Sequence, residues 1–116
     1  MRETTATPHD NDVLYGNGQD GTIKAHPGNE NFRKLVDQGK PLYVTARSTR
    51  KKGPIVSKIV NQIRNLNPPG RFLLKDANSN LWRDVGDKKA RKKILTVLSG
   101  HALAVRRQLE AANVAT

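Results

Sequence analysis

The sequence predicts an α+β fold with three short helices, a β-hairpin and a C-terminal helix. Residues 54–66 repeat aliphatic side chains every three to four positions, which is the period of an amphipathic helix. Residues 72–75 and 81–85 are short apolar segments on either side of a turn-rich stretch, which is the pattern of a hairpin. This order of elements is winged-helix-like, and in winged-helix proteins the third helix enters a DNA groove.

Length and composition limit the size of the domain. The chain has 116 residues, which suits one domain. We expect a disordered tail at residues 1–11, a single α+β domain at residues 12–99 and a helical extension at residues 100–116. Hydrophobic residues make up 35% and aromatic residues 4%, so the core must be small and mainly aliphatic. The aromatic side chains should carry a large share of it: Tyr15, Phe32, Tyr43, Phe72 and Trp82.

The first half of the chain predicts one strand and two helices. Residues 12–15 form a short apolar run suited to a strand, and the glycine-rich residues 16–28 suit a loop. Asn29 is a good N-cap for the first helix, which Gly39 would end. A second short helix is expected at residues 41–46, followed by a basic link.

The second half begins with the third helix. Pro54 suits its first turn, where a missing N–H leaves no bond unmade. After the hairpin, Asp87 suits the N-cap of the last helix, and Gly100 either kinks one long helix or separates two. The apolar face of the third helix consists of Ile55, Val56, Ile59, Val60, Ile63 and Leu66.

The charge balance favours a polyanionic partner. Lysine and arginine number 21 against 10 aspartates and glutamates, which gives a formal net charge of +11 and a pI near 10.5. No acidic residue lies between Asp37 and Asp76. The sequence has no cysteine, no apolar run long enough to span a membrane and no signal-peptide pattern. We therefore expect an intracellular, nuclear protein that does not bind a membrane.

Several separate segments resemble one known family. They are NDVLYGNG at residues 11–18, HPGN at 26–29, FRKLV at 32–36, GRFL at 70–73 and LWRDVGDKKARKK at 81–93. Together they resemble an uncharacterised small domain family abundant in diatoms. The resemblance covers roughly residues 11–98 and implies a single small domain of unsettled function. The family commonly has Gly-Arg-Gly after the strand, whereas this chain has Gly16-Asn17-Gly18, so no role for an arginine carries over.

Two basic clusters lie on either side of the third helix and the hairpin. The first comes directly before that helix, and helix N-termini bind phosphate through free N–H groups and the helix dipole. The second opens the last helix, where cations oppose the dipole. The alternative interpretation of the first cluster is a solvated loop, and that of the second cluster is the exposed face of the last helix. The predicted nucleic-acid-binding residues are Arg47, Ser48, Thr49, Arg50, Lys51, Lys52, Ser57, Lys58, Asn61, Gln62, Arg64, Arg71, Lys75, Lys88, Lys89 and Lys92.

These observations predict double-stranded DNA binding by a basic helix-turn-helix-like domain with a regulatory role in transcription. The basic cluster before the third helix would hold phosphates, and the polar face of that helix would read bases. Asparagine and glutamine can pair with adenine, and arginine with guanine. RNA binding within a ribonucleoprotein and binding of an acidic protein are the alternatives. A homodimer formed through the C-terminal helix is a further hypothesis.

No set of residues predicts catalysis, a cofactor or a metal site. Residues 16–21 match the glycine pattern of a phosphate cradle but lack the surrounding βαβ unit. Ser99 and His101 lie two positions apart and would not face each other on a helix. The chain has three histidines and no cysteine, without the spacing of a metal site. We expect no enzyme and no cofactor, and we expect His26 to support a turn.

Overall fold

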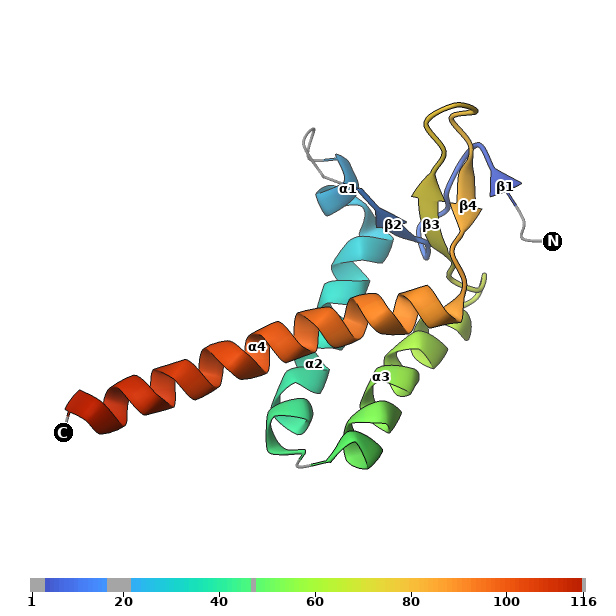
Figure 1. The fold of residues 1–116 in the computed structure, drawn as a ribbon. Helices are drawn as coiled ribbons and strands as arrows, with labels where there is room; N and C mark the ends of the chain where they lie inside the picture. The colour runs from blue at the N-terminus through green and yellow to red at the C-terminus, as the bar shows by residue number, and fades with distance from the viewer. Residues whose placement is uncertain (1–3, 17–21, 47, 116) are drawn as a thin grey trace.

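The computed structural model describes residues 4–16, 22–46 and 48–115 (Figure 1). It confirms a mixed α+β fold with a hairpin and a C-terminal helix. The elements, in chain order, are β1 (Thr4–Thr5), β2 (Val13–Tyr15), α1 (Thr22–Ala25), α2 (Pro27–Thr45), α3 (Thr49–Arg64), β3 (Phe72–Lys75), β4 (Trp82–Asp84) and α4 (Asp87–Ala115).

The hairpin belongs to a four-stranded sheet with the order β1-β4-β3-β2. β3 and β4 pair antiparallel, and β2 pairs parallel to β3 with Val13 opposite Phe72. Parallel pairing requires a long crossover, which α1, α2 and α3 provide. β1 pairs with β4 through Thr4 and Thr5, which corrects the prediction of disorder at these residues. Thr4 and Thr5 are too few and too polar to show a periodic pattern in the sequence. They form a strand because they pair with β4.

The core lies where α2, α3 and α4 pack on one another and on the sheet, and α4 crosses α2 and α3 in Figure 1. Four residues of the predicted apolar face of α3 are buried, Val56, Ile59, Val60 and Ile63. Ile55 is partly buried, and Leu66 packs on the core from beyond the end of the helix. Phe32 and Phe72 meet edge to face, with ring centroids 6.2 Å apart. The prediction of Trp82 as a core residue is wrong. This side chain on β4 is only half-buried and is not part of the hydrophobic core cluster.

One long helix replaces the two predicted before the basic link. α2 begins at Pro27, within the predicted loop, and His26 rather than Asn29 is its N-cap. It continues through Gly39, which is buried: a Cβ there would lie 3.3 Å from Cδ1 of Ile59. Gly39 therefore lets α3 approach α2 closely instead of ending the helix. The helix also passes Pro41, at the loss of one backbone hydrogen bond.

α3 begins five residues earlier than Pro54, so the basic link is largely helical. Ser48 is its N-cap, and the hydroxyl of Ser48 accepts from the backbone N–H of Lys51 at 3.3 Å. The predicted loop at residues 16–28 also contains α1. α4 runs without a break through Gly100, where an added Cβ would meet nothing within 4 Å.

Candidate nucleic-acid interface

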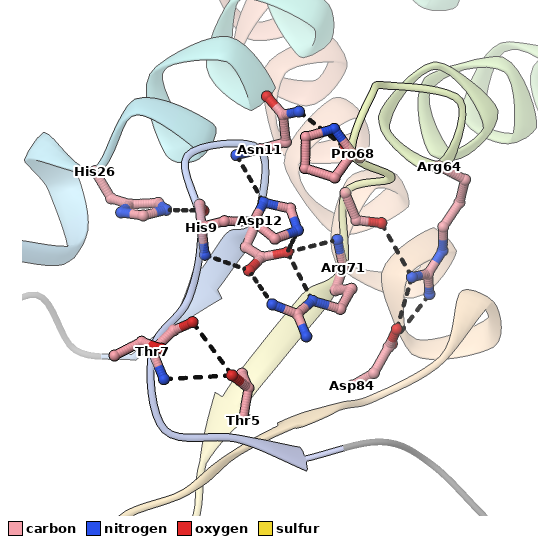
Figure 2. A network of polar contacts seen from close by, with 11 residues as sticks. Thr5, Thr7, His9, Asn11, Asp12, His26, Arg64, Pro68, Arg71 and Asp84 are labelled. Atoms are coloured by element: carbon pink, nitrogen blue, oxygen red, sulfur yellow. Dashed lines mark hydrogen bonds and ion pairs between the residues drawn. The ribbon is translucent and has the colours of Figure 1, made fainter.

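Arg71 is bound to a buried carboxylate (Figure 2). Asp12 is 0% exposed and accepts from Nε of Arg71 at 3.0 Å, from Nη2 at 2.7 Å and from its backbone N–H at 3.0 Å. Burial alone would raise the pKa of Asp12, but hydrogen bonds from Arg71 and the His9 backbone hold that pKa below its ordinary value. The guanidinium of Arg71 joins β2 to β3, and its predicted contact with nucleic acid stays a prediction.

Arg64 is bound in the same way at the end of α3. Its Nη1 and Nη2 donate to both carboxylate oxygens of Asp84, at 2.6 and 3.0 Å, and its Nε donates to Asp87 at 2.9 Å. The hydrogen bonds that Arg64 donates to Asp84 and Asp87 raise the pKa of Arg64 still further. Arg64 therefore joins α3 to β4 and to the start of α4, and its predicted role in reading bases stays a prediction. We call Asp12, Arg71, Arg64, Asp84 and Asp87 the ion-pair network.

The start of α2 is fixed to the same region. The buried side chain of Asn29 accepts from the backbone N–H of Leu14 at 2.7 Å and donates to its carbonyl at 2.9 Å, as a neighbouring strand would. Gly28 packs so closely on β2 that an added Cβ would overlap the backbone oxygen of Asp12. His26 supports the turn before β2, as predicted, because its Nε2 donates to the carbonyl of His9 at 3.0 Å (Figure 2).

A groove of about 670 Å³ lies between the first half of α3 and the first turns of α4. Four cations line it, Lys52 from α3 and Lys88, Arg91 and Lys92 from α4. Three hydroxyl groups also line it, those of Tyr43, Ser57 and Ser99. Across the ranges that the structure describes, no carboxylate lines this groove or pairs with any of the four cations. We call these four residues and the space between them the basic groove.

Aromatic and hydroxyl groups fix the floor of the basic groove. The ammonium of Lys52 lies 5.0 Å from the ring centroid of Tyr43, within cation–π distance. The hydroxyl of Tyr43 lies 2.9 Å from Oγ of Ser99, and this hydrogen bond links α2 to α4. These contacts fix Tyr43, Lys52 and Ser99 relative to one another, while Lys88, Arg91 and Lys92 are exposed.

Like charges at the start of α4 are unfavourable unless an anion lies near them. Lys88 is in the first turn of α4, where the helix dipole disfavours a cation. Arg91 and Lys92 lie three and four positions further on, which places all three on one side of the helix. A bound phosphate would remove both the repulsion and the dipole penalty. The arrangement therefore suits a ligand with more than one negative charge.

The structure divides the predicted site residues among several places. Lys52, Ser57, Lys88 and Lys92 come together in the basic groove. Lys58 and Gln62 line a separate cleft of about 220 Å³ between α2 and α3, and Asn61 is exposed on the same helix. Arg50, Lys51 and Lys89 are exposed outside these cavities, while Ser48 caps α3. Arg47 lies outside the described residues, as does the side chain of Thr49.

Lys75 lies apart from the basic groove. It is exposed on β3, with its ammonium 5.9 Å from the ring centroid of Trp82. Figure 1 shows the β3–β4 hairpin at the opposite end of the molecule from the start of α3. Lys75 is not among the residues that line the groove.

Three polar residues that line the groove were not among the predicted site residues, namely Arg91, Tyr43 and Ser99. Arg91 could have been predicted from the sequence, because it lies three positions after Lys88 in the same basic cluster and residues at this spacing share a helix face. Lys88 itself was predicted to bind nucleic acid. Tyr43 was predicted only as a core residue, and it is buried. Ser99 meets Tyr43 across 56 positions of sequence, a distance over which no local pattern gives information.

Among the described residues, no group of three or more histidine, aspartate or glutamate side chains could hold a metal ion. Within those same residues, no helix is long and apolar enough to cross a membrane.

Comparison with known proteins gives one match. The family model described as Domain of unknown function (DUF6824) matches residues 12–100. No curated protein and no solved structure matches significantly. The matched segment begins at Asp12 and contains every residue of the ion-pair network and of the basic groove. The chain therefore belongs to the DUF6824 family.

Proposed function

We propose that this domain binds double-stranded DNA through the basic groove, in a regulatory role in the nucleus. The observation that carries the proposal is the gathering of four cations from two helices with no acidic partner among the described residues. We also infer that the family is the one abundant in diatoms that the sequence motifs resemble.

The chemistry of the groove suits a phosphate backbone. Lysine, arginine and hydroxyl groups are the side chains that most often donate to phosphate oxygens in protein–DNA complexes. The groove volume of about 670 Å³ is small beside a duplex, so it would hold phosphates of one strand at its mouth. Such contacts would set the position of the domain on DNA and would not by themselves select a sequence.

Base recognition is assigned to the exposed side of α3. Ser57 borders the groove, and Asn61 lies four positions further along the helix, so both lie on neighbouring surface. Lys58 and Gln62 are on the far side of Asn61, toward α2. An amide side chain can pair with both the N6 and N7 atoms of adenine in the major groove. Asn61→Ala should therefore change the preference among sequences, while overall affinity changes little.

A charge-matched pair of triple variants tests the role of the groove. Lys88→Gln/Arg91→Gln/Lys92→Gln removes three groove cations. Lys34→Gln/Arg106→Gln/Arg107→Gln removes the same charge from exposed positions outside every cavity described above. Binding to a short fluorescent duplex would be followed by anisotropy at several salt concentrations. Four phosphate contacts predict that wild-type affinity falls about a hundredfold between roughly 50 and 200 mM salt.

The groove variant should lose most of this salt dependence, because each lost contact reduces the log–log slope by about one. The matched variant should keep most of it. Equal losses in the two variants would show that total charge, and not the groove, governs binding. A wild-type protein that binds no duplex at low salt would refute the proposal. Tighter binding to a matched RNA duplex would instead favour a ribonucleoprotein role.

A further inference from the structure

A second cavity of about 520 Å³ lies between β2, α1, α2 and α4. Its walls are mainly apolar, with Val13, Phe32 and Val36 contributed by the core and Val97 by α4. Val97 is 42% exposed, so the cavity opens to solvent beside it. This space shares no residue with the basic groove.

Lys93 lines this cavity on a different face of α4 from the groove cations. It is half-buried, and its ammonium lies 4.0 Å from the ring centroid of Tyr15. No carboxylate pairs with Lys93 anywhere in the described part of the chain. Burial lowers the pKa of this lysine, because its charge loses hydration without gaining a counter-ion.

The other cations around the cavity are engaged or exposed. Lys40 pairs with Asp37 at 2.8 Å, and Nη2 of Arg33 donates to the carbonyl of Lys24 at 2.8 Å. The side chain of Lys24 itself is exposed. Lys93 therefore differs from the other cations at this cavity, because it is half-buried and pairs with no carboxylate of the described residues. An incoming anion would supply its counter-ion.

We propose that this cavity binds a small organic anion with an apolar body, whose carboxylate pairs with Lys93 and whose hydrocarbon contacts Phe32, Val36 and Val97. A half-buried ammonium beside apolar walls matches both parts of such a molecule. An ion pair formed away from water is stronger than one at the surface, since the effective dielectric is lower. The proposal concerns residues outside the basic groove and goes beyond DNA binding.

A pair of probes separates charge from hydrophobicity. Naphthoate carries a carboxylate, and naphthyl methanol replaces it with a neutral group of similar size. Each would be titrated into the full chain, with binding followed through the backbone amide signals in nuclear magnetic resonance spectra. Naphthoate should shift the amides of β2 and of the first half of α2, and it should bind the wild type at least about tenfold more tightly than naphthyl methanol.

Two single variants assign that difference to one side chain. Lys93→Gln should remove the tenfold preference for naphthoate. Lys89→Gln, which removes the same charge one helical turn earlier and outside the cavity, should keep it. Equal binding of the two probes to the wild type would overturn the proposal even if Lys93→Gln failed to fold. It would also be overturned by shifts confined to the basic groove, or by an equal effect of both variants.

Discussion

The ion-pair network and the basic groove both draw on α3 and on the start of α4, but the cations that α3 contributes to them lie at its two ends and differ in what faces them. At the C-terminal end, Arg64 meets two carboxylates, and Arg71 meets a third that is completely buried. At the N-terminal end, Lys52 faces the cations of α4, and no carboxylate of the described residues pairs with them. The formal charge of +11 therefore counts two kinds of cation, one that holds the fold together and one that is available to a ligand.

This difference also bears on the motif segments by which the sequence resembles a known family. Asp12, Gly28 and Asn29 lie in the first two motif segments, and Arg71 and Asp84 lie in the last two. All of them fix strands or helices to one another. Only the end of the last segment, with Lys88, Arg91 and Lys92, reaches the groove. The fold thus accounts for most of these segments.

The largest effect should follow from breaking the ion-pair network. Asp12→Ala would leave the guanidinium of Arg71, 19% exposed, without its buried counter-ion. Removing one partner of a buried pair costs about 3–5 kcal/mol of the free energy of unfolding. Asp10→Ala, at an exposed position two residues earlier, should change it by less than about 0.5 kcal/mol. Urea denaturation would compare the two variants, and similar midpoints would contradict a structural role for the pair.

The carboxylate of Asp12 should also make the free energy of unfolding depend on pH. The pKa of Asp12 is lowered in the folded protein, so the unfolded chain binds the proton more tightly. Its contribution is complete above the ordinary aspartate pKa of about 3.9 and is lost as pH falls through the folded-state value. The stability difference between wild type and Asp12→Asn should therefore shrink in acid. A difference that stayed constant from neutral to acid pH would exclude this linkage.

A smaller effect should distinguish two helical glycines. Gly28→Ala would place a Cβ against the backbone of Asp12 and force the start of α2 away from β2. Such overpacking typically costs about 1–3 kcal/mol. Gly100→Ala adds a Cβ that meets nothing within 4 Å and should stabilise α4 by roughly 0.5–1 kcal/mol. Thermal melts monitored by circular dichroism would show the opposite signs, and two shifts of the same sign would disprove the packing argument.

The sequence predicted those parts of the fold that depend on local periodicity. The apolar face of α3, the hairpin and the start of α4 follow from side-chain spacing. The continuity of α2 could not be predicted in this way. Glycine and proline normally mark helix ends, and α2 contains Gly39 and Pro41. What overrides them here is the packing of α3 on Gly39, a tertiary contact with no local signature.

The candidate site was predicted only in part, for a related reason. Spacing can show which side of α3 is polar, but it cannot show what stands opposite that side. Arg64 and Lys52 carry the same charge in one helix, and only the fold places Asp84 beside the first and Lys88 near the second. Residues from α2, α3 and α4 meet in the groove through contacts far apart in sequence.

The smallest expected effect compares two neighbouring lysines in the first turn of α4. Lys88→Gln and Lys89→Gln should each raise the free energy of unfolding by a few tenths of a kcal/mol, because each removes a cation that the helix dipole disfavours. Only Lys88 lines the basic groove, so only its replacement should also weaken duplex binding. Urea denaturation and anisotropy on the same samples would measure both quantities. If Lys88→Gln lowered stability, as loss of an ion-pair residue does, this groove cation would be holding the fold together. The basic groove would then not differ from the ion-pair network as described.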